Sequence, residues 1–228
     1  MQKRIYNISL LVTSVFVYFV WKLFDAIDLS VISTDAIRKI VVMAIDFVVA
    51  YGFFHFFANI LVMLSGNVSL VKRLILGSQY IEGVWVGYWY LEENGEKKPI
   101  FFKEIIEQTV DDIVISGEAY YRDRTLRCYY SSDALVKIDT RDYSLFYVYN
   151  ARFAAQNDNC LGVTYLRLQH RGHFTSPERF LGYSMNLGNE KTEDGAIGMR
   201  VSKLPHKFTS QQLLDKAIKF YNEENTIN

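Results

Sequence analysis

The distribution of apolar and polar positions changes once along this chain, near residue 76. Before that point two long stretches are almost entirely apolar, and after it short segments alternate apolar and polar residues between turn signals. Long apolar stretches are typical of membrane-spanning helices, whereas alternation with a period of two is typical of half-buried strands. The sequence therefore predicts two domains, a helical hairpin over residues 1–76 and a β-rich domain over residues 77–228.

The first apolar stretch covers residues 5–21, and none of its 17 residues is charged. That length is the lower limit for a transmembrane helix. A cleaved signal peptide has a similar apolar core, but residues 22–25 offer no small-residue cleavage site. The second stretch, residues 40–64, contains 25 residues with one formal charge, on Asp46. We predict two N-terminal transmembrane α-helices joined by a hairpin loop over residues 25–39.

Basic residues flank this helical hairpin on its outer ends. Lys3 and Arg4 precede the first apolar stretch, and Lys72 and Arg73 follow the second, while the loop between them carries both acidic and basic residues. Cytoplasmic segments of membrane proteins are enriched in lysine and arginine. We therefore expect a multi-pass membrane protein with both termini, and the whole β domain, in the cytoplasm.

The second apolar stretch contains polar side chains at Asp46, His55 and Asn59. Ionisable and polar residues inside a membrane are candidates for function, and polar groups also hold helices together in lipid. The alternative is that Asp46 reaches the outer interface and that neutral His55 packs against a neighbouring helix. If these residues have a function, helix–helix association is the natural one.

The β-rich domain contains nine candidate strands separated by turn signals such as Gly188-Asn189. They cover residues 80–91, 98–108, 111–121, 125–131, 134–139, 143–153, 160–170, 178–187 and 196–202. Nine short strands with no helical pattern between them predict an antiparallel sandwich or barrel, and the expected fold is a barrel of about eight strands. Sixteen tyrosines and sixteen phenylalanines fit an aromatic interior.

The chain ends in a predicted C-terminal α-helix. Thr209 and Gln212 have the spacing of a capping box, and Phe208 can pack against Leu213 as a hydrophobic staple. The residues that follow form one apolar stripe, namely Leu214, Ala217, Ile218 and Tyr221. We expect this helix to pack on the β domain or to plug one mouth of a barrel.

Composition and motifs narrow the functional classes. Lys+Arg 25 balances Asp+Glu 25, and this neutrality argues against a protein that coats a nucleic acid polymer. The two cysteines, Cys128 and Cys160, are too few for a disulfide framework and lack metal-site spacing, and His170 and His173 have no third ligand placed by spacing. None of the common nucleotide-binding or hydrolase motifs occurs. We predict no catalytic residues, no metal and no cofactor, so the chain is expected not to be an enzyme.

Arginines alternate with aromatic residues along the β domain, and seven of these residues are the candidate ligand site. They are Trp85, Arg122, Arg127, Tyr129, Tyr147, Tyr165 and Arg167. Guanidinium groups bind phosphate in a bidentate manner, and aromatic faces stack on bases. Strand parity predicts that Arg127 shares a face with Tyr129, and that Arg167 shares a face with Tyr165. The alternative is an ordinary β surface with cross-strand aromatic pairs.

The first strand opens with Gly83, Trp85, Gly87 and Trp89 at alternate positions. This start looks like the first strand of lipocalin-type barrels, in which the tryptophan packs at the closed end. Two apolar helices, a β domain with this opening, and a length of 228 residues together resemble one family over essentially the full chain. It is the two-transmembrane β-barrel effector family of bacterial cyclic-oligonucleotide anti-phage signalling systems (CBASS).

The resemblance implies a function in anti-phage defence. The cytosolic barrel would bind a cyclic oligonucleotide made by a partner nucleotidyltransferase, as an activating ligand and not a cofactor. Binding would drive self-association, and the clustered helices would then disrupt the bacterial inner membrane and kill the cell. The competing hypothesis is a membrane-tethered, lipocalin-like binding or scaffold protein for an apolar ligand, which predicts a purely apolar cavity with the arginines outside. A membrane enzyme is the third class, and the sequence contains no site for it.

Overall fold

The structure is a computed structural model that divides into two compact units, Met1–Leu76 and Gly77–Asn228. The residues that it describes are 2–25, 35–93, 95–109, 112–132, 136–139, 143–155, 159–170, 172, 175–187, 192–202 and 208–226. Each unit is built around its own internal contacts.

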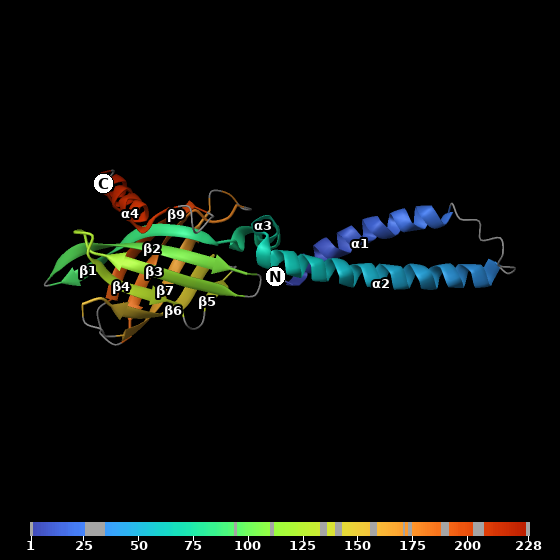
Figure 1. Cartoon of the computed structure of the whole chain (residues 1–228), viewed down its shortest axis with the longest axis horizontal. Coiled ribbons are helices and arrows are strands. Elements are labelled where there is room, and N and C mark those ends of the chain that lie inside the picture. The colour runs from blue at the N-terminus through green and yellow to red at the C-terminus, as the bar shows by residue number, and fades with distance from the viewer. Residues whose placement is uncertain are drawn as a thin grey trace. The chain divides into compact units, whose positions relative to one another are not determined.

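The described part of the first unit forms three helices, α1 (Gln2–Asp25), α2 (Asp35–Asn67) and α3 (Ser69–Leu76). Helices α1 and α2 pack against each other (Figure 1), and the rings of Phe16 and Phe53 meet with their centroids 3.7 Å apart. Helix α2 begins at Asp35, five positions before the predicted apolar stretch. Most of the predicted hairpin loop, residues 26–34, lies outside the described residues.

Among the described residues, only α2 is long and apolar enough to cross a bilayer, with a 22-residue stretch from Met43 to Leu64. The apolar part of α1, Tyr6–Lys22, is shorter. The helical prediction is therefore confirmed for both segments, whereas only the second also meets the length expected of a membrane span.

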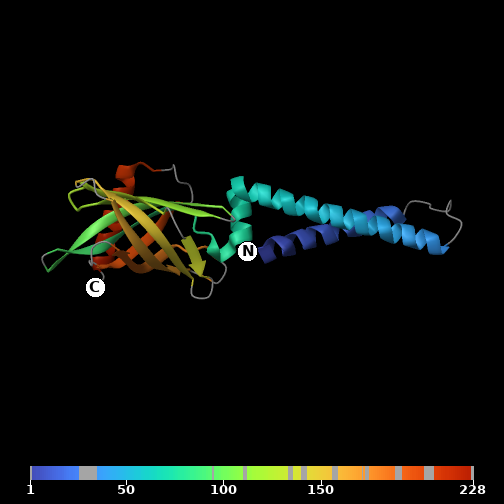
Figure 2. The ribbon, with the colours of Figure 1, turned by 90° about the horizontal axis from the view of Figure 1, so that it is seen from below.

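The described residues of the second unit contain nine strands, and each corresponds to one of the nine candidate strands. They are β1 (Gly83–Glu93), β2 (Glu96–Gln108), β3 (Ile113–Tyr120), β4 (Leu126–Ser131), β5 (Val136–Asp139), β6 (Ser144–Phe153), β7 (Asn159–Gln169), β8 (Arg179–Asn186) and β9 (Thr192–Ser202). All strand pairings are antiparallel. They join strands that are neighbours in sequence, apart from two further pairings, β9 with β1 and β4 with β6. The sheet therefore closes into a barrel (Figures 1 and 2).

Nine strands make an eight-stranded barrel because β4 and β5 share one position. Both lie along the same edge of β6, where Ser131 pairs with Asn150 and Val136 pairs with Tyr147. The two strands thus act as one interrupted strand beside β6. The predicted antiparallel barrel of about eight strands is confirmed.

Alternation along the strands separates an interior from an exterior. Residues of β1 and β2 such as Trp85, Trp89 and Phe102 point into the main core, whereas Val84 and Val86 lie on the outer face. Helix α4 (Ser210–Thr226) covers that outer face with four buried side chains, those of Leu213, Leu214, Ala217 and Phe220. The C-terminal helix therefore packs on the outside of the barrel, which decides between the two predicted placements.

The predicted capping box begins this helix. The Thr209 amide donates to Gln212 Oε1 at 2.9 Å, and the Gln212 amide donates to Thr209 Oγ1 at 3.3 Å. Two otherwise unpaired donors at the helix start are thereby satisfied reciprocally.

One end of the barrel interior is closed around Trp85. Its side chain is fully buried, and its indole N–H donates to the Ile81 carbonyl at 2.9 Å. The Arg200 guanidinium lies over the Trp85 ring at 4.9 Å and donates to the Tyr80 carbonyl at 2.7 Å. Gln108 accepts a hydrogen bond from the Ile81 amide at 2.8 Å. The segment that precedes β1 is thus fastened across the barrel end where the lipocalin-type start predicted a packed tryptophan.

Candidate functional site

The barrel interior contains a cavity on the Trp89 side of this closed end. The cavity encloses about 490 Å³ of space between atoms, including the part open to solvent. Phe180 lines the cavity and lies between Trp85 and Phe102, with ring centroids 5.4 Å and 5.9 Å away. Aromatic rings therefore separate the closed end from a cavity that is small and largely lined by side chains.

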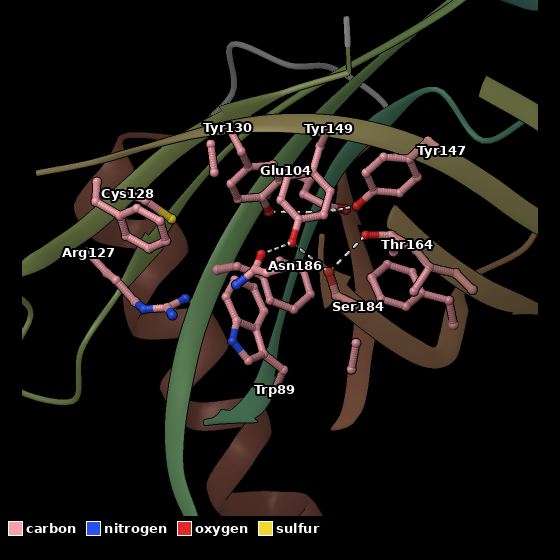
Figure 3. Close-up of a pocket in the computed structure, with 16 residues that line it drawn as sticks. Trp89, Glu104, Arg127, Cys128, Tyr130, Tyr147, Tyr149, Thr164, Ser184 and Asn186 are labelled. Carbon is pink, nitrogen blue, oxygen red and sulfur yellow. Dashed lines mark hydrogen bonds between the residues drawn. The ribbon is translucent and has the colours of Figure 1, made fainter. Parts of the chain in front are cut away.

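Glu104 is the central polar residue of the cavity (Figure 3). It lies on β2 at an inward position between Phe102 and Ile106, and only 4% of it is exposed. Its Oε1 accepts hydrogen bonds from the hydroxyls of Tyr130, at 3.0 Å, and Tyr147, at 2.8 Å. Its Oε2 is buried and has no hydrogen-bond partner among the described residues.

Burial raises the pKa of Glu104 to about 7, because a carboxylate loses its hydration in the barrel interior, although the bonds from Tyr147 and Tyr130 act in the opposite direction. Burial, and next the negative charge of Glu104, raise the pKa of both tyrosines well above the usual value. The tyrosines therefore remain donors at neutral pH, while the carboxyl can exchange its proton.

A second polar network lies beside the first. The Tyr149 hydroxyl donates to Asn186 Oδ1 at 2.7 Å, and Ser184 Oγ donates to the Tyr149 hydroxyl at 3.0 Å. Thr164 Oγ1 is 3.1 Å from Ser184 Oγ. Four neighbouring side chains from β6, β7 and β8 thus satisfy one another inside the barrel (Figure 3).

Two glycines position the tyrosine rings. Gly117 pairs with Tyr130 across β3 and β4, and a Cβ at Gly117 would lie 2.3 Å from that ring. Gly162 pairs with Tyr149 across β6 and β7, and a Cβ there would lie 2.2 Å from the ring. Each ring lies flat over the neighbouring strand because no side chain occupies that place.

The opposite wall of the cavity is rich in donors. Figure 3 shows the guanidinium of Arg127, the indole nitrogen of Trp89 and the amide of Asn186 on the same side of the cavity. Arg127 is 9% exposed and lies over the Phe153 ring at 5.2 Å. Trp89 is 7% exposed, and its Nε1 has no hydrogen-bond partner among the described residues. This wall can accommodate an anionic or hydrogen-bond-accepting group.

Of the seven ligand-site residues predicted from sequence, Arg127 and Tyr147 line this cavity. Trp85 lies beneath it in the closed end. The other four lie on the outer surface: Arg122, Tyr129 and Arg167 are exposed, and Tyr165 is half-buried and stacks on Tyr183 with centroids 5.6 Å apart. The structure therefore does not bring the seven residues together into one site.

Arg127 and Tyr129 do not share a strand face, contrary to the parity prediction. Ala119 pairs with Cys128, but Tyr120 pairs with Leu126, so Arg127 is an extra residue at a β-bulge. A bulge redirects a side chain, and here the side chain of Arg127 lines the cavity while Tyr129 is 53% exposed. A count of alternate positions cannot detect this extra residue.

The predicted membrane residues lie on α2. His55 and Asn59 are exposed in the helical unit, and His55 lies against the Tyr51 ring at 4.5 Å. Asp46 belongs to α2, but its side chain lies outside the described residues.

The main residue that sequence reasoning missed is Glu104. It interrupts an inward series of apolar residues at Ile100, Phe102 and Ile106, and a lone carboxylate at such a position is the signal that could have identified it. Within the described residues no group of three or more metal-ligating side chains occurs. Comparisons with protein-family models, curated proteins and solved structures find no match, so the function is argued from the site itself.

Proposed function

We propose that this chain is a membrane-anchored sensor whose β-barrel binds a small polar ligand in the cavity around Glu104. One observation carries the proposal. Among the described residues, the buried acceptor Glu104 Oε2 has no donor and the buried donor Trp89 Nε1 has no acceptor, and both residues line the same cavity. Each such unpaired group costs about 1–3 kcal/mol, and a ligand that pairs with both groups recovers that free energy.

The lining of the cavity favours a polar ligand over an apolar one. An apolar-ligand carrier predicts an apolar interior with the arginines outside, whereas Arg127, Glu104 and Asn186 all face this cavity. The aromatic walls at Trp89 and Phe102 are suited to a flat ring. An amphipathic ligand with a ring, hydrogen-bonding edges and an anionic group matches this combination.

A cyclic oligonucleotide, the ligand that the family resemblance implies, has those three features. The cavity comprises about 490 Å³ of space between atoms, including its part open to solvent, so the barrel interior takes only part of such a ligand. We place one base inside the barrel, and we place the phosphates near Arg127.

The proposed output is at the membrane. Helix α2 can cross a bilayer, and its exposed His55 and Asn59 provide polar groups for association between helices. In this proposal α1 also spans the bacterial inner membrane, both termini are cytoplasmic, and ligand-driven clustering of the helices disrupts the membrane during phage infection.

The outer face of the barrel offers a surface for that self-association. Strands β7 and β8 and the residue after them carry exposed apolar side chains, namely Leu161, Leu181, Tyr183, Met185 and Leu187. Contiguous exposed apolar residues are typical of interaction sites. The partner proposed for this surface is a second copy of the chain.

Titration calorimetry with the full chain in lipid nanodiscs tests the proposal. Cyclic dinucleotides should bind with an affinity on the order of micromolar, about 8 kcal/mol, and a fatty acid of similar mass is the control. Binding of the fatty acid but of no cyclic dinucleotide would favour the carrier hypothesis. A second readout is the size of the assembly, which should increase with the ligand.

A further inference from the structure

The unpaired oxygen of Glu104 has a defined hydrogen-bonding character. The other carboxyl oxygen, Oε1, accepts the hydroxyl protons of both Tyr130 and Tyr147. Among the described residues, no group donates to Oε2. The two bonds donated to Oε1 favour the ionised carboxylate, whereas burial raises the pKa of Glu104 to about 7, so the carboxylate predominates above that pH. What the site lacks is therefore one or two N–H or O–H donors directed at Oε2.

The nucleobases differ in this respect. On its Watson–Crick edge, guanine presents a ring N–H and an adjacent amino group, which are two neighbouring donors. Adenine presents an amino group beside a ring nitrogen that is an acceptor, and a carboxylate next to that nitrogen is repelled. A side-chain amide, which has one donor and one acceptor, complements adenine instead.

We propose, on the basis of the ligand class proposed above, that Glu104 selects the base that enters the barrel, so that the cavity takes guanine in preference to adenine. Trp89 Nε1 and Arg127, on the opposite wall, then donate to acceptor atoms of the same ligand. Glu104 thereby sets specificity from β2, outside the arginine-rich segment around Arg122 and Arg127.

Bound water is the competing explanation for the two unpaired groups. The cavity is lined by polar groups that can hold ordered water, and such water molecules could satisfy both Glu104 Oε2 and Trp89 Nε1. Under that explanation Glu104 has no contact with a ligand, and the base does not affect affinity. The two explanations therefore differ in a measurable preference.

The experiment measures binding of cyclic di-GMP and cyclic di-AMP to the full chain in nanodiscs. Wild-type protein should bind cyclic di-GMP about 5- to 150-fold more tightly, the range for one specific base contact. Glu104→Gln should weaken cyclic di-GMP by a similar factor and shift the preference towards cyclic di-AMP. Glu107→Gln is the matched control, because Glu107 is exposed on the same strand.

The outcomes separate the two proposals. Equal affinity of the wild-type protein for both probes, or unchanged cyclic di-GMP affinity of a folded Glu104→Gln variant, overturns the base selection and leaves the sensor function standing. Binding of neither probe by the wild-type protein overturns both. The wild-type comparison needs no variant, so it decides the question even if Glu104→Gln does not fold.

Discussion

Trp85 and Trp89 lie four residues apart on the same inward face of β1, and their surroundings differ. Trp85 is fully buried, donates to the Ile81 carbonyl and lies under the Arg200 guanidinium. Trp89 is almost as buried, but its indole N–H has no partner among the described residues and faces a cavity with Arg127. The first tryptophan closes the barrel, and the second lines the cavity in which we propose that a ligand binds.

The two regions of the barrel differ in whether their buried polar groups are hydrogen-bonded. At the closed end, Gln108 and Arg200 satisfy the backbone of the segment before β1. Around the cavity, tyrosine hydroxyls satisfy one oxygen of Glu104 and leave the other unpaired. Buried polar groups of folded proteins are generally paired, so the groups that have no partner among the described residues mark a candidate binding site.

The largest expected effect is on the closed end. Trp85→Ala should lower the free energy of unfolding by about 3–5 kcal/mol, because it leaves a cavity and removes both the indole hydrogen bond and the contact with Arg200. Chemical denaturation of the full chain in detergent, followed by near-ultraviolet circular dichroism, measures the change. A loss below about 1 kcal/mol would mean that the closed end is not where the barrel derives its stability.

The cavity end should instead make stability depend on pH. Burial raises the pKa of Glu104 from 4.5 to about 7, so the folded chain binds more protons than the unfolded chain between these values. The proton on Glu104 therefore stabilises the folded chain. This contribution to the free energy of unfolding is fully present below pH 4.5 and is lost as the pH rises through about 7, by about 3 kcal/mol in total. Denaturation curves at several pH values measure this slope.

Glu104→Gln is the control for that slope, because the amide has a similar shape and does not titrate. The slope between pH 4.5 and 7 should flatten in this variant. Tyr130 and Tyr147 do not contribute, since their raised pKa values keep them protonated throughout. An unchanged slope would assign the pH dependence to other groups.

The sequence predicts the regular parts of this fold well. Alternation identified the strands, and the Thr209–Gln212 spacing identified the start of α4, because both depend on local periodicity. Closure through β4 and β6 depends on pairing between distant residues, which a single sequence does not reveal.

The site was harder to predict than the fold for the same reason. Arg127 reaches the cavity through a bulge, and Glu104 meets Tyr147 only because the barrel closes. Charge and aromatic content singled out Arg167 and Tyr165, yet the outer face of a barrel carries such residues as readily as the interior does. Ligand-binding residues can therefore be identified only from the closed barrel, whereas strands can be identified from the local sequence pattern.

The two arginines that were expected to bind phosphate can now be separated. Arg127 lines the cavity and Arg167 is exposed on the outer face. Arg127→Ala should weaken binding of a cyclic dinucleotide by about 1.5–3 kcal/mol, the range for a charge-assisted hydrogen bond, and Arg167→Ala should leave it unchanged. Calorimetry on both variants in nanodiscs measures the difference, and an equal loss in the two variants would move the ligand site to the outer surface.

The smallest effect tests the two tryptophans directly. Trp89→Phe removes an N–H that has no partner while it keeps most of the aromatic packing against Phe102, which is 5.3 Å away. Stability should remain unchanged or increase by up to about 1 kcal/mol, because a buried unpaired donor is lost. Ligand binding should weaken by about 0.5–1.5 kcal/mol, the net value of one neutral hydrogen bond.

Trp85→Phe, at the closed end, should do the opposite and lower stability without a change in affinity. If Trp89→Phe destabilises the barrel as much as Trp85→Phe does, Trp89 has a structural partner and the contrast between the two ends of the barrel fails.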